Sequence, residues 1–322
     1  MSKTSTDLVR HALNGATMGT RWSALFFAAQ SFDVAPLHAA LQDAVTEVDE
    51  QMSVWKPDSG LMRINRAPPG EWIDVPAQLV ALLRRSLAIG RASGGAFDIG
   101  VGDAAAAWGF GPEAAADARI RAALAATRRP CWEVLEIEED RVRKHAMVTL
   151  DLNGIAKGHG TDRLADTLTA FGITSFLAGI DGEMRAAGLR PDGEAWTIAV
   201  EQPDPARRAA HSVLALADAA VATSGDYRHW VDVNGRRLSH TINPERGAPL
   251  AQSPASVTVV AGTCEEADAW ATALMVLGPE TGVAIAERMG LDALFLMRGA
   301  GNVIAARAAG TLFAGTASAR RQ

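Results

Sequence analysis

The sequence predicts an α+β fold with substantial antiparallel pairing. Some segments repeat apolar residues at the three-to-four-residue spacing of a helix, whereas others alternate with the two-residue period of a strand. Asn234-Gly235, between two strand-like segments, is a strong signal for a two-residue hairpin. A purely parallel sheet would need a crossover between successive strands. The pattern therefore favours mixed, mostly antiparallel sheets with helices.

Five segments have the spacing or composition of helices. In the first, Leu37, Leu41 and Val45 share one face, and Gly172 stops the fourth. Thr263 with Glu266 forms a capping box at the start of the fifth. The predicted helices cover about Ala35–Glu50, a segment from Pro76 to Gly90, Ala114–Ala126, Thr161–Phe171 and Thr263–Gly278.

Strands are predicted where apolar residues alternate with polar ones or β-branched residues cluster. The clearest hairpin joins Trp230–Val233 to Arg236–Leu238, and Gly299–Asn302 is the expected turn of a second. Other predicted strands are Val134–Glu138, Trp196–Val200 and Ser256–Val260.

Composition limits the function classes. The 322 residues carry no fixed-period repeat or long linker, so we expect residues 1–322 to form a single domain. A net charge of −6 argues against nucleic-acid binding by a basic face. The apolar runs are too short for a membrane span, and Met1–Asp7 lacks the hydrophobic core of a signal peptide, so we expect a cytoplasmic protein. Cys131 and Cys264 are expected to be buried thiols.

The predicted helix after Thr263 carries the sharpest chemical signal. Asp268 and Thr272 lie one turn apart on one face, so a carboxylate and a hydroxyl could offer two oxygens to a hard cation such as Mg²⁺. The alternative is an Asp that hydrogen-bonds within the first turn and a Thr on a packed face. Such pairs are common on helices, so this signal alone does not decide.

Asp151–Gly158 is a second candidate, at the junction of a strand and a helix. Its glycines would let a ligand approach the backbone, and Lys157, just before the predicted helix, could face phosphate. The segment matches neither the Walker pattern nor the dinucleotide fingerprint. A left-handed turn with a surface lysine is the alternative.

Further candidates lie elsewhere in the chain. Thr223–Tyr227 places small hydroxyls after an apolar strand, and His240 could accept a proton near neutral pH, although a lone histidine at a strand end is more often structural. No hydrolase triad order accompanies Ser224. Gly94–Asp98 and Met52–Trp55 could hold a flat ring or form packed turns.

In combination, these segments resemble the ApbE family of FAD:protein FMN transferases. The similarity extends from about Ala16 to Gly278, and the segments form a specific set in their order. They are Ala16–Thr20, Met52–Trp55 with Ser59, Ile64-Asn65, Gly95–Ile99, Trp108–Phe110, Asp151–Gly158 with Asp162, Gly182-Glu183, Thr223–Tyr227, His240–Pro244 with Gly247, and Ala267–Ala273.

The resemblance implies an α+β, T-fold-like architecture with FAD in a cleft between lobes. It also implies an enzyme that uses Mg²⁺, or Mn²⁺ in its place, to move the FMN half of FAD onto a threonine hydroxyl of an acceptor protein, releasing AMP. By motif position, the metal ligands are Asp268, Thr272 and the carbonyls of Gly154 and Ala271. The FAD contacts are Met18, Trp55, Ala96, Phe97, Asp98, Asp151, Lys157 and Ile242, with Trp55 stacked on the flavin. The catalytic residues are Asp268, Lys157 and His240, the last as general base.

Four positions depart from the family pattern. Asn243 stands where an Asp is usual, Glu245-Arg246 replaces Arg-Thr, and Asp181 stands where Gly is common. Two other functions stay open. One is a Mg²⁺-dependent FAD pyrophosphatase, in which water replaces the threonine. The other is a flavin-binding protein without turnover, which the retained candidate metal ligands disfavour.

Overall fold

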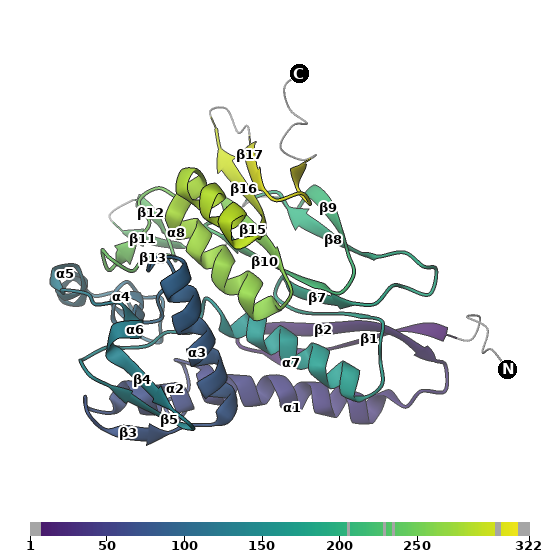
Figure 1. Ribbon diagram of the computed structural model, residues 1–322, viewed down its shortest axis with the longest axis horizontal. Coiled ribbons are helices and arrows are strands. Elements are labelled where there is room, and N and C mark those ends of the chain that lie inside the picture. The colour runs from purple at the N-terminus through teal and green to yellow at the C-terminus, as the bar shows by residue number, and fades with distance from the viewer. Residues whose placement is uncertain (1–7, 205–206, 228–229, 234–235, 300–303, 315–322) are drawn as a thin grey trace.

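An antiparallel eight-stranded sheet forms the centre of the computed structural model, which describes residues 8–204, 207–227, 230–233, 236–299 and 304–314 (Figure 1). The strand order is β1-β2-β6-β7-β10-β15-β16-β17, and each neighbouring pair is antiparallel. These strands are β1 Leu8–Thr17, β2 Thr20–Ala29, β6 Phe176–Ile180, β7 Glu183–Ala187, β10 Ala219–Gly225, β15 Ser256–Ala261, β16 Asp292–Arg298 and β17 Ile304–Ala309. The predicted antiparallel α+β class is confirmed.

Smaller sheets flank the central one. They are β3-β5-β4 (β3 Trp72–Asp74, β4 Leu135–Glu138, β5 Arg141–Lys144), β8-β9 (Trp196–Glu201, Ala210–Leu216), β11-β12 (Trp230–Val233, Arg236–Ser239) and β13-β14 (Ile242–Asn243, Ala248–Pro249). The strands on both sides of Asn234-Gly235 pair as predicted. The strands around the second predicted turn also pair, as β16 and β17. Residues 234–235 and 300–303 lie outside the described residues.

Three long helices, α1, α7 and α8, lie along one face of the central sheet (Figure 1). The helices of the described chain are α1 Val34–Met52, α2 Gly60–Arg66, α3 Ala77–Ala92, α4 Gly102–Ala107, α5 Asp117–Ala125, α6 Cys131–Val134, α7 Ala156–Ala170 and α8 Cys264–Met289. Leu41 of α1, Leu164 of α7 and Phe26 of β2 are buried in one cluster. On the other face, Trp196 and Leu214 of β8-β9 cover the sheet. Burial of these apolar faces fixes the layers.

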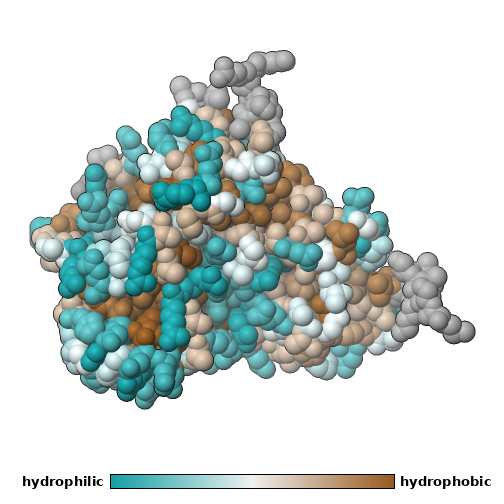
Figure 2. All heavy atoms as spheres, in the orientation of Figure 1, coloured by the Kyte–Doolittle hydropathy of each residue, from teal (hydrophilic) through white to brown (hydrophobic). Residues whose placement is uncertain are grey.

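Helix α8 is a core helix. Trp270 and Leu274 pack with Val257 of β15 and Phe295 of β16. By length and composition, α8 is the one helix of the described residues that could cross a membrane. A buried helix of a globular core meets the same two criteria, and the surface over α8 mixes hydrophilic and hydrophobic residues (Figure 2).

Several predicted boundaries were wrong, among them the start of α5, which lies at Asp117 rather than Ala114. Helix α7 begins at Ala156 rather than Thr161. Glycine lowers helix propensity, but the glycines of α7 permit close packing against α8. Helix α3 runs past Gly90 to Ala92. The predicted helix end at Gly278, within α8, is confirmed, because Gly278 leaves the helical conformation with φ 71°. A further helical stretch follows from Pro279, a residue well suited to a first helical turn. Val134 belongs to α6, so β4 begins one residue later than predicted. Both cysteines are buried, as predicted.

Candidate active site between α7 and α8

The first turns of α8 present the predicted pair of oxygen ligands. The Thr263 side chain accepts a hydrogen bond from the Glu266 amide, which confirms the predicted start of the helix. Asp268 is 5% exposed, and its Oδ2 accepts the backbone N–H of Gly158 at 3.0 Å. Thr272 Oγ1 lies 3.2 Å from Ser224 Oγ at the end of β10. Asp268 is therefore held against α7, and Thr272 against the sheet.

Gly154 meets this face of α8 from the loop before α7. A Cβ atom added to Gly154 would lie 3.1 Å from Thr272 Oγ1 and 3.3 Å from the Phe97 ring. Only a residue without a side chain leaves that space open. Ala271, fully buried, is the neighbour of Thr272 on α8. The structure thus brings together Gly154, Phe97 and Thr272, which are far apart in the sequence.

Lys157 is already paired with carboxylates. Its Nζ lies 2.7 Å from Glu183 Oε1 and 3.9 Å from Asp181 Oδ2. Although burial opposes the charged form, Glu183 and Asp268 raise the pKa of Lys157 above its usual value. The sequence predicted that Lys157 lies just before a helix. This placement was wrong, because Lys157 occupies the first turn of α7. The lysine lies opposite a carboxylate that is itself buried.

Burial dominates the electrostatics of Asp268. Removal from water and the nearby Glu183 carboxylate raise the pKa of Asp268 to about 7, against the opposing effect of Lys157. Glu183 is 3% exposed, and its Oε2 is a buried oxygen without a hydrogen-bond partner. Two buried carboxylates thus share one lysine. A positive charge brought to Asp268 would relieve this imbalance.

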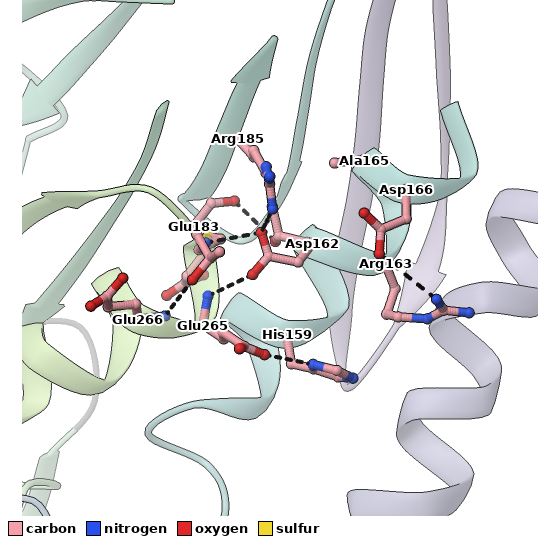
Figure 3. A network of polar contacts seen from close by, with 12 residues as sticks. His159, Asp162, Arg163, Ala165, Asp166, Glu183, Arg185, Glu265 and Glu266 are labelled. Carbon is pink, nitrogen blue, oxygen red and sulfur yellow. Dashed lines mark hydrogen bonds and ion pairs between the residues drawn. The ribbon is translucent and has the colours of Figure 1, made fainter. Parts of the chain in front are cut away.

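Asp162 of α7 holds the N-terminus of α8 (Figure 3). Its two carboxylate oxygens accept the backbone N–H groups of Cys264 and Glu265, each at 2.9 Å. The same carboxylate also receives Arg185 of β7. A carboxylate at this end of a helix pairs with otherwise unsatisfied N–H groups and with the positive end of the helix dipole. Asp162 therefore ties the helix that carries Asp268 to α7 and to the sheet.

We expect Asp162→Ala to lower the free energy of unfolding by about 2–4 kcal/mol. The change removes the acceptor of the Cys264 and Glu265 N–H groups and leaves Arg185 without its carboxylate. Denaturant unfolding of the purified protein measures the loss. Asp166→Ala is the control, because Asp166 lies on the same helix with a side chain that is 63% exposed. Equal stability of the two variants would contradict the stabilising role of Asp162 at the N-terminus of α8.

The predicted FAD contacts come from several loops. Trp55, 62% exposed, follows the end of α1, where its backbone N–H bonds to Ser53 Oγ. Ala96 and Phe97 are buried, whereas both Asp98 oxygens accept backbone N–H groups, from Gly100 and Cys131. Asp98 therefore shapes its own loop.

Met18 and Asp151 both lie near the first turns of α7. Met18 lies in the tight turn between β1 and β2 with φ 47°, and its Cε is 3.2 Å from a Cβ built on Gly160. Asp151 accepts the backbone N–H and the side-chain amide of Asn153. Both residues thus border the start of α7.

His240 lies between β12 and β13, and Ile242 is the first residue of β13. The His240 ring meets Phe110 edge-on, with 6.4 Å between ring centroids. Ile242 is buried with Trp108, whose Nε1 donates to the Gly247 carbonyl. The catalytic role of His240 stays a prediction.

Two departures from the family pattern have structural explanations. Asn243 Oδ1 accepts the backbone N–H of Arg246, so the amide closes the turn that leads to Gly247. Asp181 has φ 50°, a left-handed conformation that Gly adopts freely and Asp tolerates better than most residues.

Sequence reasoning assigned no role to two residues of this site. Glu183 and Asp162 appeared only as members of a motif, yet one pairs with Lys157 and the other with the N-terminus of α8. Their partners lie 26 and 102 residues away in the chain. The only local sign of Glu183 in the sequence was its position directly after Gly182, at the start of a strand.

Comparison with known proteins places the chain beside flavin transferases. The ApbE family model matches residues 18–295. FAD:protein FMN transferase of Vibrio cholerae is 36% identical over 290 residues, 89% of this chain and 87% of the relative, and that of Escherichia coli K12 is 34% identical over 286 residues, 87% and 82%. The solved flavin transferase ApbE from Vibrio cholerae has a TM-score of 0.83 at 33% identity and covers 94% of this chain and 97% of its own. The Pseudomonas stutzeri flavinyl transferase ApbE has a TM-score of 0.82 at 34% identity, with 94% and 95% covered.

Proposed function

Because the chain belongs to the ApbE family, we propose that it transfers the FMN half of FAD to a threonine hydroxyl of an acceptor protein, releases AMP and depends on Mg²⁺. The observation that carries this proposal is that Asp268 and Thr272 lie one turn apart on α8, with Gly154 against Thr272 and Gly158 against Asp268. The relatives named above are FAD:protein FMN transferases or flavin transferases by name, and they align with most of the chain.

The residues present fit a magnesium ion. Carboxylate, hydroxyl and carbonyl oxygens from Asp268, Thr272, Gly154 and Ala271 are the hard ligands that Mg²⁺ prefers. Within the described part of the chain, no three His, Cys, Asp or Glu side chains gather in a group that could hold a metal. Mg²⁺ commonly uses only one or two carboxylates together with phosphate oxygens and water. A single buried Asp therefore suits a cation that binds together with a diphosphate.

The bond changes balance as a phosphoryl transfer. The threonine oxygen forms a bond to the phosphorus of the FMN half, and the pyrophosphate P–O bond breaks, so AMP carries away the bridging oxygen. Mg²⁺, when bound, would neutralise the charge that develops on the phosphates. His240 takes the hydroxyl proton as general base, which requires a group that accepts protons near neutral pH. Lys157 supplies a fixed positive charge beside Asp268.

The loops position FAD in this proposal. Trp55 stacks on the isoalloxazine ring, and Met18, Ala96, Phe97, Asp98, Asp151 and Ile242 line the remainder. A large aromatic ring left 62% exposed has free surface for a flat ligand. The same site could pass FMN to water, so a pyrophosphatase is the second candidate, favoured only where no acceptor reaches the site.

One experiment separates these functions. FAD is incubated with the protein, with Mg²⁺ or a chelator, and with or without an acceptor flavoprotein, and AMP is quantified by chromatography. Flavin that stays on the denatured acceptor, and appears with AMP only when Mg²⁺ and acceptor are both present, supports the transferase. An acceptor whose target threonine is replaced by alanine should stay unlabelled. AMP and free FMN without acceptor would establish the pyrophosphatase instead, and no AMP under any condition would overturn both.

We expect Trp55→Ala to raise KM for FAD about 2- to 10-fold, because aromatic stacking contributes about 0.5–1.5 kcal/mol. The melting temperature should not change, since the side chain is largely exposed. Steady-state AMP release and a thermal melt measure the two effects. Met147→Ala, which removes a side chain that is 80% exposed, is the control and should leave KM unchanged. An unchanged KM in Trp55→Ala would remove Trp55 from the flavin site.

A further inference from the structure

Asn65, near the end of α2, makes an unusual pair of hydrogen bonds. Its Oδ1 accepts the backbone N–H of Leu150 at 2.7 Å, and its Nδ2 donates to the carbonyl of the same residue at 2.9 Å. A neighbouring strand would satisfy a backbone in the same way. Leu150 is fully buried and lies outside the helices and strands, so its backbone groups depend on such a partner.

A buried lysine supports this contact. Lys144 is 1% exposed, and its Nζ donates to the Asn65 carbonyl at 2.9 Å and to the Val148 carbonyl at 3.4 Å. Burial lowers the pKa of Lys144, and no carboxylate of the described residues forms an ion pair with it. Burying a lysine without a carboxylate partner costs free energy of folding. Lys144 therefore bonds to one end of the segment Val148–Leu150, and Asn65 bonds to the other end.

This segment leads directly into the candidate active site. The Asp151 backbone N–H bonds to the Ile99 carbonyl, next to the Phe97-Asp98 loop. Leu152 then begins the turn that carries Gly154 to Thr272. At its other end, α2 is capped by Ser59, whose hydroxyl donates to the Ser53 carbonyl, two residues before Trp55. Helix α2 and its cap are thus bonded to two of the segments assigned to FAD, the one before Asp151 and the one before Trp55.

We propose that Asn65 is a positioning residue, which fixes segment 148–154 so that the Gly154 backbone stays against Thr272 of α8. The proposal rests on the proposed function for its activity readout, but its structural claim is independent of that function. Asn65 itself touches neither metal nor FAD in this assignment. Its influence passes through the backbone of Leu150.

The test compares three variants of the whole chain. Asn65→Ala removes both bonds, whereas Asn65→Asp keeps an acceptor for the Leu150 N–H and loses the donor. Ile64→Val, at a residue 1% exposed on the same helix, disturbs packing without touching these bonds. Hydrogen exchange over residues 148–154 is measured for each, together with the melting temperature and the Mg²⁺ concentration that gives half-maximal AMP release.

In Asn65→Ala, residues 148–154 should exchange at least tenfold faster, and the half-maximal Mg²⁺ concentration should rise about tenfold. Asn65→Asp should retain part of the protection at Leu150, which keeps the proposal testable if the alanine variant does not fold. Ile64→Val should lower the melting temperature and change neither readout more than twofold. Unchanged exchange in both Asn65 variants, or equal changes in Ile64→Val, would overturn the proposal. If the native protein releases no AMP, the proposed function has failed, and exchange over residues 148–154 still decides the role of Asn65.

Discussion

Asp268→Asn is expected to lower Mg²⁺-dependent transfer of FMN about 10²- to 10⁴-fold while the protein stays folded. The metal supplies several kcal/mol of charge stabilisation in a phosphoryl transfer, and each 1.4 kcal/mol is about tenfold in rate. Asn has nearly the same shape and can still accept the Gly158 N–H with its amide oxygen. The variant therefore removes the charge while it leaves the packing in place.

The stability of this variant separates chemistry from folding. Burial and Glu183 raise the pKa of Asp268 to about 7 from an ordinary value of 3.8. A carboxyl whose pKa is higher in the folded than in the unfolded state weakens the fold as pH rises through that interval. The neutral Asn is free of this penalty, so without metal at pH 8 its melting temperature should equal or exceed that of the native protein.

Asp166→Asn is the matched control for Asp268→Asn. It makes the same chemical change on α7, at a carboxylate whose nearest ion pair is a long one of 3.8 Å with Arg163. Its transfer rate should equal that of the native protein. Full Mg²⁺-dependent activity in Asp268→Asn would show that the carboxylate is not a ligand. A large loss in Asp166→Asn would instead point to a general effect of charge.

Local patterns predicted the part of the site that one helix carries. The capping box at Thr263 located the start of α8, and helical spacing then placed Asp268 and Thr272 on one face. The glycines of Asp151–Gly158 pointed to a close approach, and the structure brings Gly154 beside Thr272. These inferences needed only spacing within one segment.

Longer-range features were beyond local patterns. Lys157 looked like a free cation, because its partner Glu183 lies on a strand after the whole of α7. The pairing of β2 with β6 depends on burial of a shared face and not on any hairpin between them. The start of α7 was missed because glycine lowers helix propensity, whereas packing against α8 requires it.

Gly158→Ala should lower the free energy of unfolding by about 3 kcal/mol. In an open helix this substitution stabilises by up to about 1 kcal/mol, because it restricts the unfolded chain. Here the new Cβ would lie 2.4 Å from the Cys264 carbonyl oxygen and 2.8 Å from Asp268 Cβ. Backbone atoms cannot rotate away, so α7 and α8 must separate, and overpacking of this kind costs about 1–3 kcal/mol or more.

Gly160→Ala distinguishes this clash from a general intolerance of alanine in α7. Its new Cβ would meet Ile180 Cδ1 at 2.8 Å and Met18 Cε at 3.2 Å, which are the ends of flexible side chains. Small rotations relieve such contacts, so the free energy of unfolding, measured with denaturant, should change by less than about 1 kcal/mol. Gly158→Ala should also lose transfer activity, since the separation moves Asp268 away from Gly154. If both variants unfold at the same denaturant concentration as the native protein, the two helices do not pack as closely as their glycine contact requires.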